Sequence, residues 1–351
     1  MTPDIKYLLE PVVQNKLPND GPIHFVVVGA GGTGGYFIPQ LVRQMAIINK
    51  NRQVKHTLTV YDKDDIEEKN LTRQNFIQAD IGKNKAEVMA SRYGRSFAQE
   101  VGYVPEYIKD PIVFGKEIIS RLYPDSNRQH VVLVDCTDNN KTRLIMKEAA
   151  DMMQGSIGHG TVVLLSSGNE ESAGQIICSF KPRMKNNKKI IYSDIPGLSI
   201  EYHSLSTPDF FDVFPNFDLE KLPDELSCAE AAVSSPQNIF TNMSAANILF
   251  GYANRLLNNQ GISELMIFFD TSSFTQKVYR HKYTDMKDML NFSKNNAAFK
   301  DYLGNHKDAG IETTGELQRP MTWKQALEQT QKEKEEKEKE VESLVQSVLA
   351  K

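Results

Sequence analysis

A glycine cluster that directly follows an apolar run constrains this chain more than any other feature of its sequence. The stretch 26–41 reads "VVVGAGGTGGYFIPQL", where Gly29, Gly31 and Gly34 fit the spacing G-x-G-x-x-G and Gly32 lies among them. Glycines permit a tight turn and let the backbone approach a phosphate, and the N-terminus of the following helix supplies free N–H groups. The stretch predicts a nucleotide-phosphate site. The glycines alone leave open whether the nucleotide is oxidised or split, or whether the turn is purely structural.

Strands and helices alternate on both sides of this cluster. Residues 23–28, 57–61 and 130–135 are apolar runs of strand length, and longer segments between them have helical periodicity. This alternation predicts an α/β fold with a doubly wound, mostly parallel sheet. The other expected elements are strands at 161–166, 175–180 and 264–270 and helices at 33–48, 81–97, 141–153 and 236–257.

Changes in composition divide the 351 residues. Residues 1–22 are polar and interrupted by prolines, which indicates an N-terminal extension with a short helix at most and a linker. The main domain is expected at 23–284. Within it, residues 181–235 are mostly rich in Pro and Asp, and a loop of this length is usually functional or disordered. Residues 285–351 form a polar C-terminal extension that ends in a charged helix containing "QKEKEEKEKE".

The charge and cysteine content exclude several classes of protein. A net charge of −4 gives no general electrostatic signal for nucleic acid or a membrane surface, and no run approaches the roughly 18 apolar residues of a membrane helix. The N-terminus does not have the pattern of a signal peptide. Cys136, Cys178 and Cys228 contain no CxxC pair, so a four-thiolate zinc site within one chain is excluded. Sparse cysteines suit the cytoplasm, where we expect this protein.

A second stretch, "VYDKDDIEEKNLTRQNF", narrows the choice of nucleotide. Asp62 ends the second expected strand, where doubly wound sheets bind ligands, and its carboxylate can accept hydrogen bonds from ribose hydroxyls. It lies 33 positions after Gly29, whereas a nicotinamide or flavin fingerprint places its carboxylate about 20 residues on. The spacing weakens the oxidoreductase interpretation.

Charged and polar side chains follow in an order that suits a triphosphate. Asn70, Arg73 and Gln74 come after Asp62, and Lys85 falls in the first turns of the next helix. Hydride transfer needs no Arg/Lys clamp, whereas attack on the α-phosphate of ATP does, because charge develops on the departing pyrophosphate. Mg²⁺ takes one or two carboxylates together with phosphate oxygens, so a lone carboxylate at position 138 suffices.

Each of these residues has a plainer interpretation when it is taken alone. Lys85 is then a solvated helix charge, with Lys83 as a rival two residues earlier. Asp138 is a helix N-cap. Asp64 and Asp65 are solvated loop charges. Only the ordered set favours a functional role for these residues over the plainer interpretations.

In this order the motifs resemble the adenylation domain of the ThiF/MoeB/HesA superfamily, which includes ubiquitin-activating enzymes. The resemblance is strong over 23–180 and returns over 226–270. It implies ATP and Mg²⁺ as cofactors. Around the phosphates it implies a cradle formed by Gly29, Gly31, Gly32 and Gly34, with contacts from Asn70, Arg73 and Lys85. It further implies that Asp62 holds the ribose, that Gln74 orders the loop of the phosphate contacts, and that Asp138 binds Mg²⁺.

The resemblance also implies a substrate and partners. The substrate would be the C-terminal glycine carboxylate of a ubiquitin-like or sulfur-carrier protein, the enzyme a homodimer, and the next partner a conjugating enzyme or a sulfurtransferase. In the family a crossover loop carries an acyl-accepting cysteine, and Cys228 is the candidate for a thioester; as an alternative it is a packing residue at a helix start. Cys136 and Cys178 lie in expected strands and read as structural.

The sequence departs from the family pattern at two points, and three alternatives to the expected function remain. The partner's N-terminal arginine that reaches the γ-phosphate in the family has no counterpart, since the first arginine is Arg43, and the zinc-binding CxxC pairs are absent. The substrate of adenylation is alternatively a small molecule, a peptide or tRNA. A nicotinamide-dependent oxidoreductase and a silent partner subunit are further alternatives, although Arg73, Lys85 and Asp138 argue against a silent subunit.

Overall fold

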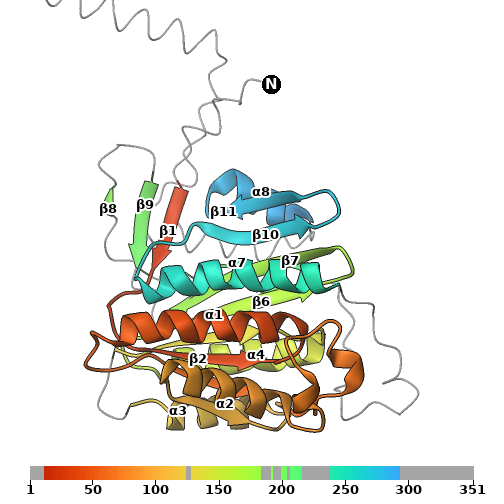
Figure 1. The fold of residues 1–351 in the computed structure, drawn as a ribbon. Coiled ribbons are helices and arrows are strands. Elements are labelled where there is room, and N and C mark those ends of the chain that lie inside the picture. The colour runs from red at the N-terminus through yellow and green to blue at the C-terminus, as the bar shows by residue number, and fades with distance from the viewer. Residues whose placement is uncertain are drawn as a thin grey trace, which may run out of the picture.

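The computed structural model describes residues 12–123, 128–182, 191–192, 199–203, 206–215 and 238–292. Figure 1 shows an α/β fold in which helices pack on both faces of one large sheet, with a smaller sheet beside it. The expected charged C-terminal helix and the cysteine at position 228 fall outside the described residues.

The large sheet has eight strands in the order β11-β10-β7-β6-β5-β2-β3-β4. The pairs from β6 to β4 are parallel, and β7, β10 and β11 are antiparallel. The chain runs to one side of β2 through β3 and β4, and to the other side through β5 and β6. The topological switch therefore lies at the carboxyl ends of β2 and β5, where open α/β sheets bind ligands. The strands are β2 (Ile23–Val28), β3 (Thr57–Tyr61), β4 (Val101–Val104), β5 (His130–Asp135), β6 (Thr161–Asn169), β7 (Ala173–Pro182), β10 (Glu264–Asp270) and β11 (Thr275–Arg280).

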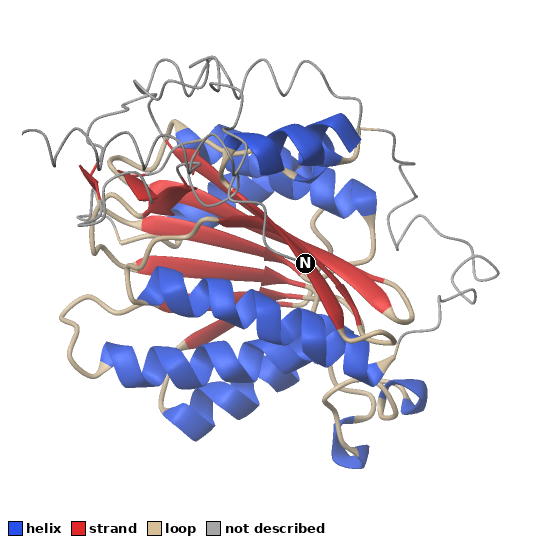
Figure 2. Cartoon of the chain, turned by 90° about the horizontal axis from the view of Figure 1, so that it is seen from above, coloured by secondary structure: helices blue, strands red, loops and turns tan. Residues whose placement is uncertain are grey.

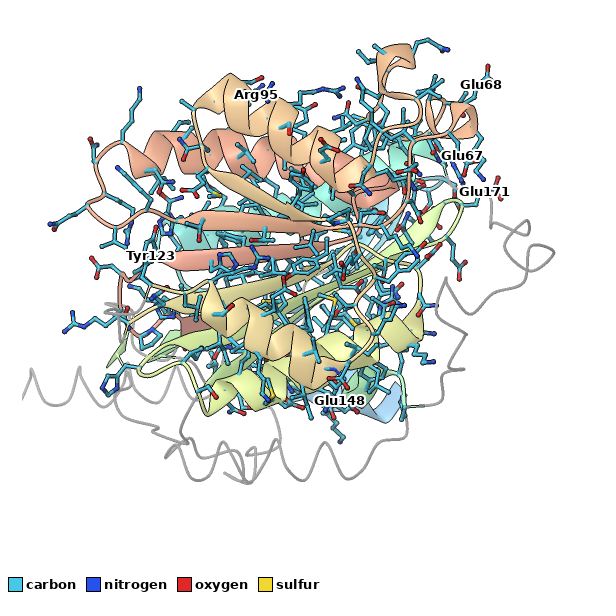
Figure 3. The ribbon with its side chains drawn as sticks, turned by 90° about the horizontal axis from the view of Figure 1, so that it is seen from below. Glu67, Glu68, Arg95, Tyr123, Glu148 and Glu171 are labelled. Atoms are coloured by element: carbon cyan, nitrogen blue, oxygen red, sulfur yellow. The ribbon has the colours of Figure 1, made fainter. Side chains whose placement is uncertain are left out.

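Two layers of helices cover the sheet because its central strands are apolar on both faces. Val27 of β2 packs in one core with α1 (Gly32–Asn49), α2 (Lys85–Phe97) and α7 (Ile239–Leu257), and its neighbour Val26 packs in the opposite core. The opposite face carries α3 (Pro111–Ser120) and α4 (Asn140–Gln154). Figure 2 shows the sheet between these layers, and in Figure 3 Arg95 of α2 and Glu148 of α4 lie on opposite sides of it. The expected α/β fold with a mostly parallel sheet is confirmed.

The boundary of α2 differs from the expectation. The helix begins at Lys85, not at residue 81, because the Asn84 side chain caps it by accepting a 3.0 Å hydrogen bond from the Glu87 N–H. The 3₁₀ turn η3 (Gln78–Asp80) lies directly before residue 81, where we expected the helix to begin. The elements β4, α3 and β11 were not expected at all.

A small sheet, β1-β9-β8, contradicts two expectations. Val12–Lys16, expected in a helix or linker, form β1, which pairs in parallel with β9 (Ser199–His203), and β9 pairs with β8 (Ile191–Tyr192) inside the segment expected to be irregular. The backbone of Asn15 also exchanges two 2.7 Å hydrogen bonds with that of Ile262. The N-terminal segment is thus attached to the main domain.

A third hydrophobic core, besides those on the two faces of the parallel strands, packs against the antiparallel strands of the sheet. It combines α5 (Phe210–Val213) and α8 (Tyr283–Phe292) with β10 and β11. Met286 and Met289 are buried in it, so α8 crosses residue 284, where we placed the end of the main domain. No helix of the described residues is long and apolar enough to cross a membrane.

Candidate nucleotide-binding site

The glycine cluster forms the loop between β2 and α1, at the topological switch. Gly29 has a φ of +95°, which favours glycine, and its N–H donates to the Tyr61 carbonyl at 2.9 Å. A Cβ at Gly34 would lie 1.9 Å from the Gly29 carbonyl oxygen, so only glycine fits the first turn of α1. Gly31 caps the helix without a side-chain hydrogen bond. The loop therefore presents backbone N–H groups and a positive helix end, as a phosphate requires.

Asp62 joins the end of β3 to this loop. Its Oδ2 accepts a 2.7 Å hydrogen bond from the Ala30 N–H, and its Oδ1 accepts a 2.9 Å bond from the Asp64 N–H. Burial raises the pKa of Asp62 to about 6, reinforced by Asp64 and opposed by Lys85 and the two hydrogen bonds. A carboxylate offers about four lone-pair sites, so the two left over suit ribose hydroxyls.

Asn70 ends the short 3₁₀ turn η2 (Glu68–Asn70) and is buried. Its Oδ1 accepts a 2.8 Å hydrogen bond from the Glu67 N–H, and its carbonyl oxygen accepts a 2.8 Å bond from the Gln74 N–H. The side-chain oxygen therefore holds the turn that presents Arg73. No described residue accepts a hydrogen bond from the side-chain nitrogen.

Arg73 and Gln74 flank the glycine loop. Arg73 is half-buried, and its guanidinium has no carboxylate partner among the described residues. Gln74 is 8 % exposed, and its side chain lies 3.4 Å from the place where a Cβ of Gly31 would be. The Gln74 Oε1 is buried without a hydrogen-bond partner. Buried polar atoms are almost always paired, whereas the Gln74 acceptor beside the glycine loop lacks a partner among the described residues. The half-buried Arg73 guanidinium is free to bind an anion there.

Lys85 is the first residue of α2 and is buried, not a solvated helix charge. Its Nζ lies 2.8 Å from Asp64 Oδ2, and Tyr107 donates a hydrogen bond to the other carboxylate oxygen. Burial would raise the pKa of Asp64, but the Lys85 ammonium and the two hydrogen bonds hold it below its usual value. Asp64 is an exposed loop residue, as expected, and it also forms this ion pair. Lys83 is exposed and donates to the Ala79 carbonyl.

Asp138 follows β5 and is exposed. It does not cap α4, because Asn139 takes that position and accepts a 2.9 Å hydrogen bond from the Thr142 N–H. Thr137, its other neighbour, lies against Gly29. The described residues contain no cluster of three or more His, Cys, Asp or Glu side chains that could hold a metal ion. A single free carboxylate next to a phosphate cradle fits Mg²⁺, which takes its other ligands from phosphate and water.

The structure adds a buried ion pair to the residues found in the sequence. Arg143 Nε lies 2.7 Å from Asp135 Oδ2, and the same guanidinium donates to the Thr137 and Ser167 carbonyls at 2.7 Å. Burial raises the pKa of Asp135, although Arg143 and Thr137 oppose the shift. The pair fixes the loop from β5 to α4 that carries Asp138. The sequence signal was an aspartate ending a strand and an arginine in the first turn of the next helix.

A second group missed in the sequence lies on the other side of the loop. Asn242 of α7 is fully buried, and its side chain contacts Gly32 and the backbone of Arg73. An asparagine within an apolar helix is a local signal of a buried polar contact, but nothing local identifies a contact 169 residues away.

A cavity of about 420 Å³ opens between the β6–β7 and β10–β11 turns. Glu170, Gln175, Phe268 and Lys277 are among its lining residues. Asn169, which precedes the lining residue Glu170, accepts a 3.2 Å hydrogen bond from Thr33 of α1. In Figure 3 Glu67 and Glu171 lie at this end of the sheet and Tyr123 at the opposite end.

The cysteines separate into two groups. Cys178 is fully buried in β7, and Cys136 packs against the main core. Burial raises the pKa of both thiols well above the usual value, with a further rise from Asp135 at Cys136 and from Glu264 at Cys178. Neither is placed to form a thiolate. Cys228 lies outside the described residues.

Comparison with known proteins assigns the chain to a family. The ThiF family model matches residues 9–264. Solved structures with a similar fold include PaaA, at 15% identity and a TM-score of 0.44 over 74% of this chain and 64% of that one. E. coli MccB with succinimide has 14% identity and a TM-score of 0.45, and E. coli MccB with ATP has 13% and 0.44, each over 79% of this chain and 66% of the other.

The chain spans just under two thirds of the length of these structures. No curated protein matches the sequence. The match to the ThiF model covers the glycine loop, the Arg73 segment, the β5–α4 loop and all of α7, and the chain belongs to the ThiF family of E1-like adenylation domains.

Proposed function

We propose that this protein adenylates the C-terminal carboxylate of a protein or peptide, and that the substrate is the C-terminal glycine of a ubiquitin-like or sulfur-carrier protein. The observation that carries the proposal is the pair Arg73 and Gln74, which leave a cation and a buried acceptor without partners beside the glycine loop. Membership of the ThiF family supports the reaction class. A small molecule or tRNA is the alternative substrate, and the net charge of −4 argues against tRNA because it indicates no basic surface.

In the proposed reaction a carboxylate oxygen of the substrate attacks the α-phosphorus of ATP. The bond from that phosphorus to the bridging oxygen of pyrophosphate breaks, and pyrophosphate leaves with the electron pair. The products are an acyl-adenylate and pyrophosphate. The N–H groups of the glycine loop and the Arg73 guanidinium stabilise the charge that develops on the phosphates.

Two more side chains complete the proposed site. Lys85 has three N–H donors and Asp64 takes one, so two remain for phosphate oxygens. Asp62 holds the ribose through its unused lone pairs. Asp138 would hold Mg²⁺, which supplies charge neutralisation on the phosphates when bound.

A thioester step and a dimer belong to the same proposal. Cys228 is the candidate acceptor of the acyl group, after which a conjugating enzyme or sulfurtransferase would take it over. We expect a homodimer because the family resemblance implies one, and because the site otherwise lacks a further cation at the phosphates. Light scattering tests the dimer, and a strict monomer that still adenylates would contradict it.

The function is tested by ATP–pyrophosphate exchange with candidate carrier proteins and peptides. We expect exchange that needs Mg²⁺ and a free C-terminal carboxylate on the substrate, and none with a C-terminally amidated control. A thermal-shift series distinguishes ATP from a nicotinamide nucleotide as the ligand. We expect Mg-ATP to raise the melting temperature and NAD(H) to leave it unchanged. Preferential stabilisation by NAD(H) contradicts adenylation and favours the oxidoreductase.

A further inference from the structure

One buried amide connects three parts of the candidate site. Asn242 lies in the first two turns of α7 and is fully buried. Its Oδ1 accepts a 2.7 Å hydrogen bond from Asn169 Nδ2 at the end of β6, and the Asn169 Oδ1 accepts a 3.2 Å bond from the Thr33 hydroxyl in the first turn of α1. The oxygen side of the Asn242 amide therefore links α7 to β6 and, through β6, to the start of α1.

The nitrogen side of the same amide faces the phosphate-binding residues. Asn242 Nδ2 lies 3.5 Å from the Arg73 carbonyl oxygen, at the outer limit of a hydrogen bond. A Cβ at Gly32 would lie only 2.4 Å from this nitrogen, so the amide packs directly on the first residue of α1. The backbone of Arg73 and the glycine loop are thus held against one side chain from a helix far along the chain.

We propose that Asn242 is a positioning residue that sets Arg73 and the glycine loop in register for the nucleotide phosphates. The inference rests on the proposed function, since it takes Arg73 as a phosphate contact. Only an amide of this size supplies both the acceptor for Asn169 and the donor toward Arg73. Leucine has a similar shape and neither group, and aspartate lacks the donor.

The adjacent Thr241 provides a matched control. It is also fully buried, and its hydroxyl donates to the Glu171 carbonyl at 2.7 Å and lies 3.1 Å from the Thr271 hydroxyl. These contacts attach α7 to the β6–β7 and β10–β11 turns, not to Arg73 or the glycine loop. A Thr241→Val substitution removes buried hydrogen bonds of the same helix turn while leaving the phosphate-binding backbone untouched.

The experiment measures the affinity for Mg-ATP by calorimetry in the full chain, with circular dichroism to verify the fold. We expect Asn242→Leu to weaken ATP binding about tenfold, as for loss of one effective hydrogen bond, and Thr241→Val to change it less than about twofold despite a lower melting temperature. If Asn242→Leu does not fold, Asn242→Asp, which keeps the shape, is expected to show the same loss.

A double-mutant cycle with Arg73→Ala separates positioning from general stability. Because Asn242 acts partly through Arg73 and partly through the glycine loop, we expect Asn242→Leu to cost less ATP affinity when Arg73 is already alanine than it costs in the wild-type background. Equal losses in both backgrounds, or equal losses in the Asn242 and Thr241 variants, would overturn the inference and leave the proposed function standing. A wild-type chain that binds no Mg-ATP would overturn the proposed function and this inference with it.

Discussion

Asp62 Oδ2 lies 2.7 Å from the Ala30 backbone nitrogen, so the carboxylate at the end of β3 fixes the middle of the glycine loop. One side chain thereby orders the proposed phosphate cradle and borders the proposed ribose position. The pKa of this carboxyl is raised to about 6 by burial, and the group changes charge close to neutral pH.

The raised pKa predicts a pH dependence of nucleotide binding. Below about pH 6 Asp62 is protonated, one oxygen becomes a donor, and the acceptors for Ala30 and for ribose are weakened. The affinity for Mg-ATP should therefore fall as the pH falls through about 6. Calorimetry between pH 5.5 and 8 measures this fall. Asp62→Asn should bind about tenfold more weakly at pH 8 and lose the protein part of the dependence, whereas Asp65→Asn, an exposed neighbour, should behave as wild type.

Arg73 and Asp138 should affect catalysis more than stability. Both lie at the edge of the sheet, and neither has a carboxylate or cation partner among the described residues. Their substitution by alanine removes charge stabilisation at the phosphates, and each should lower the ATP–pyrophosphate exchange rate about 10²-fold or more. The melting temperature of the free protein should stay near the wild-type value. A fully active Asp138→Ala variant would refute its role toward Mg²⁺.

Three buried histidines predict loss of stability in acid. Burial lowers the pKa of His24 to about 4, of His56 to about 3 and of His130 to about 4, helped by Arg121 at His24 and by Arg52 at the other two. The unfolded chain, with histidine pKa values near 6.5, takes up protons below that pH that the folded chain does not. The free energy of unfolding should therefore fall as the pH falls from about 7 toward 4.

The size of this effect can be measured by urea unfolding at several pH values. Each histidine should cost on the order of 2 kcal/mol by pH 5. His24→Asn should reduce the pH dependence of the free energy of unfolding by about the contribution of one histidine. His159→Gln, at an exposed position, should leave that dependence unchanged. Equal slopes for wild type and His24→Asn would show that His24 does not stay neutral in the folded chain.

Local patterns predicted the part of the fold that positions the site. β2, β3, β5 and β10 have the expected boundaries, because each is a short apolar run bounded by turn residues. The glycine loop could be recognised in the sequence because only glycine permits the φ of Gly29 and the close approach at Gly34.

Non-local contacts account for what the sequence did not reveal. β1 pairs with β9, which is far away in the sequence, and the expected phosphate contact Lys85 pairs with Asp64 across 21 positions. Neither pairing leaves a local period or spacing. In the same way, an expected phosphate contact, Asn70, uses its oxygen to hold its own turn. Charge and residue type predicted which side chains gather at the sheet edge, and not which of them bind one another.

The last prediction concerns the thioester. An acyl-adenylate is a reactive mixed anhydride, and a thiolate within reach attacks it without metal help. Burial raises the pKa of Cys136 and of Cys178, so both thiols stay protonated and enclosed. Cys228 is then the cysteine we expect to accept the acyl group. Cys228→Ala should keep ATP–pyrophosphate exchange near normal and abolish any thiol-sensitive adduct with the carrier.

A non-reducing gel of enzyme, carrier and Mg-ATP, run with and without thiol, measures this adduct. Cys178→Ala serves as the control, because it removes a core side chain and should lower the melting temperature while the adduct persists. A thiol-labile band that remains in Cys228→Ala would mean that another thiol accepts the acyl group. A wild type that never forms such a band would mean that the acyl group stays on the adenylate until a partner removes it. Either result would contradict the role proposed for Cys228.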